Sequence, residues 1–292
     1  MSANSALRRI VKKGLHPILA GHGYHYFQAL SKAWDIRNGN WTEPELDLIR
    51  FALKPGETAL DLGANFGLYS YHLSKALKGS GRIYAFEPVP FTFETMRLVA
   101  RLLRLRNVEI IPKGCSDVAG TIAFEVPVQT SGAFAAGQAY IGNRRDDRDG
   151  KEQQVRWAGT QQVACEVVKL DDFFPEIKDL TLIKCDIEGA ELMAFRGAEQ
   201  MIGKHLPTVI CEINPWFLEG FGIKLSELVG FFIDRGYHLY HYRREQGQGM
   251  LCPVKIEEVV EDNYVFIHPQ RLSRFASLLS GNTEPVASGP IE

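Results

Sequence analysis

The sequence predicts an α/β protein built on a doubly wound, mostly parallel sheet. From Glu57 onward, short apolar runs alternate with longer segments of helical periodicity. The apolar runs are nearly continuous, whereas a strand with one solvated face alternates apolar and polar residues. Parallel strands covered by helices on both faces have this pattern, and their regular alternation with helices is typical of doubly wound folds.

The strands and helices are expected to alternate along most of the chain. Five apolar runs are interpreted as core strands: residues 58–63, 82–88, 108–117, 180–189 and 208–215. Helices are expected through Leu68, Leu73 and Leu77, over 92–105, through Leu192, Phe195 and Met201, and over 225–234. Residues 237–244 and 262–269 alternate in polarity, which predicts an antiparallel hairpin at the sheet edge.

One region departs from this alternation. Residues 121–128 and 162–170 have the pattern of added antiparallel strands. The Gly-, Ala- and Arg-rich stretch between them, residues 129–160, is too long for an ordinary connection. Loops of that length in a compact domain are usually lids, binding loops or disordered.

The chain is expected to have three parts. They are an N-terminal helical extension (1–43), a main domain (44–272) with inserted strands and a loop at 121–170, and a loose C-terminal tail (273–292). The tail is assigned from its Gly, Pro and Ser residues, which favour an unstructured end.

Composition excludes several classes of protein. Hydrophobic residues make up 45% and charged residues 23% of the 292 residues, and the net charge of -2 gives no overall attraction to nucleic acid. The five cysteines are scattered without a CxxC pair, so neither a zinc site nor a disulfide framework is predicted. The basic N-terminus lacks the apolar segment of a signal peptide, and no run approaches the roughly 18 apolar residues of a membrane helix. We expect a cytoplasmic protein without a nucleic-acid partner or stable membrane insertion.

The turn after the first strand, DLGANFG, has the glycines of a ligand-binding turn. Gly63 and Gly67 permit positive φ and close approach of a ligand to the backbone. The full GxGxxG dinucleotide motif is missing, and Asp61 suits an ammonium or sulfonium better than a pyrophosphate. Taken alone, this motif is equally consistent with a structural turn.

Two further strand ends carry polar groups that suit an adenosyl ligand. Glu87 ends the second strand roughly 20 residues after the glycine turn, where a carboxylate can accept both ribose hydroxyls. Ser116 and Asp117 end the third strand, where Asp117 could accept a hydrogen bond from an adenine amino group. Glu87 as an exposed strand end and Asp117 as a turn residue are the structural alternatives. Together with Asp61 and Gly63, these residues favour an adenosyl ligand.

The motifs resemble those of the FkbM-type family of S-adenosylmethionine-dependent methyltransferases. The resemblance rests on ALDLGANFGLYS, IYAFEP, KGCSD, LIKCDIEGAELMAFRGAE and VICEINP, which follow in that order between Pro44 and about Tyr240. The Asp-x-Glu-Gly-x-Glu run is the most specific of them. The resemblance implies a seven-strand, Rossmann-like methyltransferase sheet over 44–272, S-adenosyl-L-methionine as cofactor and, most often, O-methylation of hydroxyls on small molecules and sugars.

The resemblance also assigns roles by position. It implies that the methionine part of the cofactor is held by the turn residues Asp61, Gly63, Ala64, Asn65 and Gly67. It implies that Glu87 holds the ribose, that Ser116 and Asp117 hold the adenine, and that Asp186 lies beside the methyl group. The first 40 residues and the 129–160 stretch match nothing specific, so substrate choice is not covered.

Three acidic residues at two neighbouring strand ends are the candidates for catalysis: Asp186, Glu188 and Glu212. An alcohol is a poor nucleophile, so a base or a metal should help to remove its proton. Clustered carboxylates raise one another's pKa toward a value useful to a base, or bind a divalent cation. Asp186, Glu212 and Asn214 resemble metal ligands of catechol O-methyltransferase-like enzymes by strand position only, so a divalent metal is the less favoured interpretation. Glu188 and Glu191 are also placed to cap the following helix.

We therefore predict a methyltransferase that acts on a hydroxyl of a small-molecule or saccharide acceptor. Two alternatives stay open: a binding module that keeps the cofactor pocket without catalysis and, less favoured, a nicotinamide-dependent oxidoreductase on a similar sheet. Asp186 and Glu188 argue against the first, and the incomplete glycine motif argues against the second. The sequence gives no indication of the oligomeric state.

Overall fold

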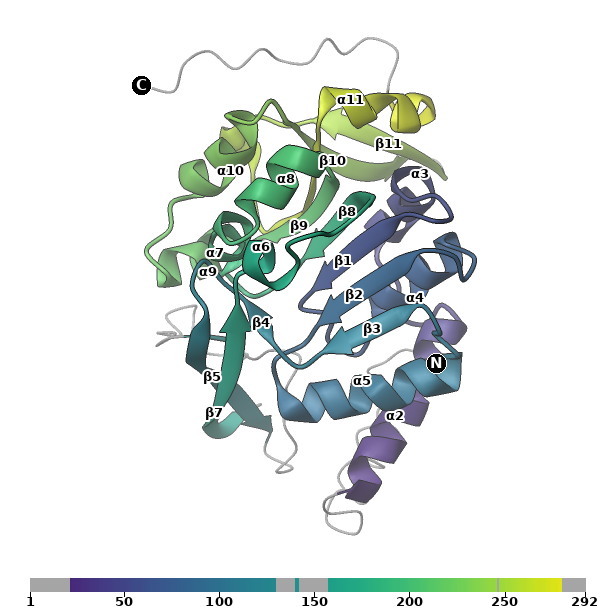
Figure 1. The fold of residues 1–292 in the computed structure, drawn as a ribbon, viewed down its shortest axis with the longest axis vertical. Coiled ribbons are helices and arrows are strands. Elements are labelled where there is room, and N and C mark those ends of the chain that lie inside the picture. Colours follow the sequence, from purple (N-terminus) through teal and green to yellow (C-terminus); the bar gives the residue numbers. More distant parts are fainter. Residues whose placement is uncertain (1–21, 130–139, 142–156, 246, 280–292) are drawn as a thin grey trace.

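The computed structural model describes residues 22–129, 140–141, 157–245 and 247–279, which form two sheets flanked by helices (Figure 1). The larger sheet runs in the order β11 (Gln248–Pro253), β10 (His238–Glu245), β12 (Asp262–Ile267), β9 (Thr208–Ile213), β8 (Leu180–Cys185), β1 (Thr58–Leu62), β2 (Arg82–Phe86) and β3 (Val108–Ile111). The smaller sheet runs in the order β4 (Gly114–Cys115), β7 (Trp157–Val168), β5 (Gly120–Gln129) and β6 (Tyr140–Ile141).

The larger sheet confirms the predicted doubly wound, mostly parallel architecture. Strands β3, β2, β1, β8 and β9 are parallel to their neighbours, and β12, β10 and β11 pair antiparallel at one edge. Every residue of β1 and β8 is buried, as their continuous apolar sequences predicted. The sheet has eight strands rather than seven, because Gln248–Pro253 adds β11 beside β10. Its mixed residues have no strand periodicity, so only the pairing with β10 makes it a strand.

Helices cover the two faces of the sheet with two separate apolar layers (Figure 1). One layer holds α2 (His22–Arg37), η1 (Pro44–Leu48), α3 (Ile49–Ala52), α4 (Leu68–Ala76) and α5 (Pro90–Leu103). The other holds α6 (Leu170–Phe173), α7 (Glu191–Arg196), α8 (Glu199–His205), α9 (Pro215–Gly220), α10 (Leu225–Ile233) and the edge of η3 (Ile256–Glu258). Alternate residues of β1 serve the two layers: Leu60 and Leu62 pack with α7 and α10, and Ala59 packs with α4.

Two predicted elements are each divided in the structure. The strand expected over 108–117 ends at Ile111, and Gly114–Cys115 form β4 in the other sheet. The ladder stops because the next donor, the N–H of Lys113, turns back to the oxygen of Ile111 at 2.9 Å. The helix expected through Leu192 and Met201 breaks into α7 and α8 around Gly197. A Cβ at Gly197 would lie 2.1 Å from the backbone oxygen of Ser116. The glycine therefore allows the α7–α8 junction to approach the backbone that follows β4.

The inserted strands are confirmed as the antiparallel pair β5 and β7. Most of the 129–160 loop lies outside the described residues, as do residues 1–21 and 280–292. The prediction of a loose tail from residue 273 is wrong for its first part. α11 (Pro269–Leu272) is followed by the 3-10 helix η4 (Ser273–Leu278). Phe275 and Leu278 of η4 are buried in the apolar layer that contains α4, because burial removes these apolar side chains from water. The other boundaries of the three predicted parts stay a prediction.

The N-terminal extension contributes α2, which packs against α5. Nδ1 of His25 lies 3.1 Å from Oγ1 of Thr95, and the His25 ring lies 4.3 Å from that of Phe91. None of the helices that the structure describes has the length and apolar character needed to cross a membrane.

Candidate functional site

The glycine turn lies between the carboxyl end of β1 and the start of α4. Gly63 has φ +77°, and a Cβ there would lie 1.9 Å from the backbone oxygen of Asp186. Asn65 and Gly67 also have positive φ, and Gly67 is the N-cap of α4. Glycine at position 63 is therefore required by the contact between this turn and the loop after β8, and that contact brings Asp186 to the turn.

Glu87, at the carboxyl end of β2, is oriented by backbone groups. Its Oε2 accepts a hydrogen bond from the N–H of Asn65 and its Oε1 accepts one from the N–H of Val89, both at 3.0 Å. Burial, reinforced by the charges of Asp61 and Asp186, raises the pKa of Glu87 to about 8. Each carboxylate oxygen has a second lone pair, so Glu87 can still accept hydrogen bonds from a ligand.

A cavity of about 170 Å³ joins the two groups of predicted site residues. It is lined by Gly63, Asn65, Glu87, Pro88, Val89, Phe124, Asp186, Ile187, Glu188 and Glu212. Four of the nine predicted cofactor residues thus line the cavity together with all three candidates for catalysis, and Asp186 belongs to both sets. Ligand pockets usually measure about 300–1,000 Å³, so this cavity has room for only part of a nucleoside-sized ligand.

Five predicted cofactor residues do not line the cavity: Asp61, Ala64, Gly67, Ser116 and Asp117. Asp61 lies beneath the turn, 1% exposed, and Oγ of Ser70 donates a hydrogen bond to its Oδ2 at 2.5 Å. Burial raises the pKa of Asp61 to about 6. Ser116 and Asp117 follow β4 in the smaller sheet, where the Ser116 hydroxyl donates to Oδ1 of Asp117 at 3.2 Å. Their cofactor roles stay predictions.

The cavity also has an apolar wall that the sequence did not reveal. Phe124 on β5 and Val89 at the start of α5 supply it, with Ile187 and Pro88. Ile122, Phe124 and Val126 form one face of the predicted inserted strand, but only the packing of the smaller sheet shows that Phe124 lines the cavity. An aromatic and aliphatic wall of this kind suits a planar base.

Lys184 on β8 is buried beneath the carboxylates. Its side chain is 1% exposed, and its ammonium donates a hydrogen bond to Oδ1 of Asn263 at 2.8 Å and lies 3.6 Å from Oδ2 of Asp186. It also lies 4.8 Å from the ring centre of Tyr69, whose hydroxyl donates to Glu43 at 2.6 Å. Burial lowers the pKa of Lys184, but the charges of Asp186, Glu43 and Glu212 outweigh burial and raise it overall. The ammonium is therefore charged at neutral pH.

Glu212, at the end of β9, neighbours Asp186, at the end of β8, and both line the cavity. Burial and the charge of Asp186 raise the pKa of Glu212 well above its usual value, which favours its protonated form. The Asp186 side chain is 37% exposed. The site thus presents the accessible carboxylate of Asp186, with the Lys184 ammonium beneath it and Glu212 beside it.

The comparisons with known proteins decide the family. A family model described as methyltransferase FkbM domain matches residues 61–239, more than half of the chain. The chain belongs to the FkbM methyltransferase family. This confirms the family expected from the sequence motifs.

Individual relatives of this FkbM-family protein are distant. It is 26% identical to "Methyltransferase 1" of Beauveria bassiana over 53% of this chain and 63% of that protein. It is 27% identical to "31-O-demethyl-FK506 methyltransferase FkbM" of Streptomyces tacrolimicus over 63% of this chain and 74% of that protein. The crystal structure of methyltransferase FkbM from Methylobacillus flagellatus KT is similar at 17% identity with a TM-score of 0.43, covering 89% of this chain and 59% of that one. The matches therefore span less than two thirds of the Beauveria protein and of the Methylobacillus structure.

The cavity of the FkbM-family protein fits S-adenosylmethionine in its donor and acceptor chemistry. Oδ1 of Asn65 is buried and has no hydrogen-bond partner among the described residues, so it can accept a hydrogen bond from a ligand. Glu87 offers oxygens to a diol, and Asp186 offers negative charge to a cationic ligand. The residues of the cavity thus match the polar groups of this cofactor.

Two polar residues near the acidic cluster, Glu191 and Asn214, hold backbone groups in place. Oε1 of Glu191 accepts hydrogen bonds from the N–H groups of Ile187 and Gly189, both at 3.1 Å, and so holds the loop after Asp186. Oδ1 of Asn214 accepts from the N–H groups at the start of α9, at 3.1 and 3.3 Å, and caps that helix. The oxygen predicted as a metal ligand at Asn214 is therefore engaged. In the described part of the chain, no group of three or more His, Cys, Asp or Glu residues is arranged to hold a metal ion.

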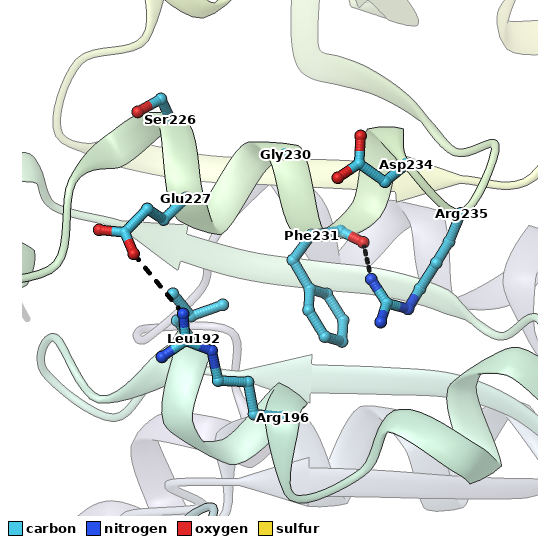
Figure 2. A pocket seen from close by; sticks show the side chains of 8 residues that line it. All are labelled: Leu192, Arg196, Ser226, Glu227, Gly230, Phe231, Asp234 and Arg235. Atoms are coloured by element: carbon cyan, nitrogen blue, oxygen red, sulfur yellow. Dashed lines mark hydrogen bonds and ion pairs between the residues drawn. The ribbon is translucent and has the colours of Figure 1, made fainter.

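A second pocket, of about 520 Å³, lies between α7 and α10 (Figure 2). Arg196 and Glu227 form an ion pair of 3.6 Å on one side of it. On the other side, the Arg235 guanidinium donates to the backbone oxygen of Phe231 at 2.6 Å (Figure 2). None of the predicted site residues lines this pocket. The candidate functional site is therefore the cavity at the carboxyl ends of β1, β2, β8 and β9.

Proposed function

We propose that this FkbM-family protein transfers the methyl group of S-adenosylmethionine to a hydroxyl of a small molecule or sugar. The observation that carries the proposal is that one cavity is lined by Asn65 and Glu87 together with Asp186, Glu188 and Glu212. The relative from Streptomyces tacrolimicus supports a hydroxyl acceptor, because its name describes an O-demethyl substrate.

The residues at one end of the cavity bind and orient the cofactor. Glu87, fixed by two backbone N–H groups, accepts the ribose hydroxyls, and Phe124 and Val89 pack against the base. When bound, S-adenosylmethionine supplies a methyl group on a positively charged sulfur. Alignment of donor and acceptor in such a site is worth about 7–11 kcal/mol of the barrier.

The residues at the other end handle the acceptor proton. Asp186 lines the cavity with a partly exposed carboxylate and would accept the proton of the acceptor hydroxyl. The hydroxyl oxygen would bond to the methyl carbon as the carbon–sulfur bond breaks, with S-adenosylhomocysteine as the leaving group. The Lys184 ammonium forms an ion pair with Asp186 and orients its carboxylate, and Glu212, whose pKa is raised, lies beside it. The buried Lys184 therefore acts as a positioning residue, since it contacts Asp186 rather than the reacting atoms.

Calorimetric titration with S-adenosylhomocysteine, with NADH as the control, tests the cofactor. Micromolar binding of S-adenosylhomocysteine alone supports the proposal, and binding of NADH alone would favour the oxidoreductase. Transfer of a radiolabelled methyl group to a panel of hydroxylated acceptors, with and without magnesium, then tests the reaction. A protein that binds S-adenosylhomocysteine but methylates none of a broad panel would favour the binding module. Turnover by Asp186→Asn equal to that of the wild type would remove Asp186 from the mechanism.

A further inference from the structure

Four arginines line a groove beside the open edge of the larger sheet. The groove measures about 460 Å³ and lies between the end of α5 and β3, which run side by side (Figure 1). Its lining consists of Arg97, Arg101, Arg104, Arg106, Ala100, Leu105, Val108 and Ile110. The chain as a whole has a net charge of -2, so this groove is a local concentration of positive charge.

Most of this charge is available to a ligand. Arg101, Arg104 and Arg106 are exposed, and Arg97 forms an ion pair with Glu94 at 3.0 Å, on the surface. Cations near a helix C-terminus complement the helix dipole, which accounts for an arginine in the last turn of α5. It does not account for Arg106, which lies beyond the helix and lines the same groove.

The strand beside the arginines has backbone groups that pair with no other strand in the described part of the chain. β3 is the last strand of the larger sheet among the described residues. The backbone oxygens of Asn107 and Ile111 accept hydrogen bonds from β2, at 2.9 and 3.0 Å. Because backbone groups in a strand alternate in direction, the N–H and C=O groups of Val108 and Ile110 face away from β2. An open strand edge of this kind is a template for another strand.

We propose that this groove binds an extended acidic peptide segment of another protein, which pairs with β3 and places alternate carboxylates on the arginines. Alternate residues of a strand are about 6.6 Å apart, and arginines four residues apart on a helix are separated by about 6 Å along its axis. The intervening side chains of the peptide point to the opposite face of the sheet, away from the arginines. The lining has no aromatic ring on which a base could stack, so the groove favours a peptide over a nucleic acid.

Fluorescence anisotropy with a labelled peptide of alternating Glu and Val tests the proposal. We compare it with a Gln-Val peptide, an N-methylated Glu-Val peptide that cannot pair with a strand edge, and an oligothymidylate of equal charge. The variant Arg101→Glu/Arg104→Glu is matched by Lys178→Glu/Lys204→Glu, which makes the same charge change at exposed positions away from the groove. Circular dichroism checks that both variants are folded.

The proposal expects the Glu-Val peptide to bind and its affinity to fall at least tenfold in the arginine variant but less than twofold in the lysine variant. Removal of the carboxylates or N-methylation of the peptide should each weaken binding at least tenfold. Equal loss in both variants, no binding of the Glu-Val peptide, or equal binding of the N-methylated peptide would overturn it. Tighter binding of the oligothymidylate, lost in the arginine variant, would assign the groove to nucleic acid instead.

Discussion

Two carboxylates that line the candidate cavity, those of Glu87 and Asp186, are held in different ways. Glu87 is oriented by the backbone N–H groups of Asn65 and Val89. Asp186 is held by a side chain, the Lys184 ammonium. Backbone donors stay in place when a neighbouring side chain changes, whereas a side-chain donor can be lost by a single substitution. The cofactor end of the site should therefore tolerate changes that disable the acceptor end.

The largest expected effect is that of Lys184→Met. This substitution removes the buried cation beside Asp61, Asp186 and Glu212. Breaking a buried ion pair lowers the free energy of unfolding by about 3–5 kcal/mol. Because Asp186 is 37% exposed, we expect the lower end of that range. Affinity for S-adenosylhomocysteine should change less than about threefold, since Glu87 is held by backbone groups. Urea unfolding and calorimetry measure the two quantities. Lys178→Met is the exposed control, and equal stability of the two variants would contradict the role of Lys184.

Glu87→Gln should act on the cofactor end alone. The amide keeps one acceptor oxygen, so one of the two backbone N–H bonds and one hydrogen bond to the ligand are lost. Above the pKa of about 8, where Glu87 is ionised, the bond to the ligand is charge-assisted and worth about 1.5–3 kcal/mol. We expect the affinity for S-adenosylhomocysteine to fall about 10–100-fold by calorimetry. Glu176→Gln, at an exposed position, provides the control. Unchanged affinity in Glu87→Gln would mean that Glu87 serves only the glycine turn.

The raised pKa of Glu87 predicts opposite pH dependences of stability and ligand affinity. Its pKa is about 8 in the folded protein and 4.5 in an unfolded chain, so the folded state holds a proton that the unfolded state has released. Stability is therefore fully present below pH 4.5 and is lost as the pH rises through 8. Ribose hydroxyls favour the ionised form, so the affinity for S-adenosylhomocysteine should rise up to about tenfold per pH unit below 8. Thermal melts and titrations at about pH 6 and pH 8.5, on either side of this pKa, measure both trends. In Glu87→Gln, the pH dependences of the melting temperature and of the affinity should both become weaker. Unchanged pH dependences would assign these trends to another titrating group.

The smallest effect is expected from Phe124→Leu, which alters the apolar wall supplied by the smaller sheet. Leucine retains most of the buried area but loses aromatic contact with the base, worth about 0.5–1.5 kcal/mol. The affinity for S-adenosylhomocysteine should fall about 2–10-fold by calorimetry. Ile122→Val on the same strand, which does not line the cavity, should have no such effect. If both variants bind equally well, the smaller sheet does not contribute to cofactor binding.

The sequence by itself determined the parts of this protein that depend on local pattern. Continuous apolar runs predicted the buried strands β1 and β8, and helical periodicity predicted α5 and α10 to within a few residues. Apolar period and hydrogen-bonding pattern are local properties, so the sequence contains them directly. The motifs around Gly63 and Asp186 also indicated the family, which the family model confirmed.

Only the tertiary structure decided which polar residues reach the cavity. The chain turns after Ile111 and enters the smaller sheet at Gly114, so Asp117 does not line the cavity as strand order had predicted, whereas Phe124 from the insertion does. Lys184 donates a hydrogen bond to Asn263 only because β12 pairs with β9, which places Asn263 opposite Glu212. These partners are separated by 79 positions in the chain. Contacts at that separation depend on how sheets and layers pack, and no local periodicity encodes them.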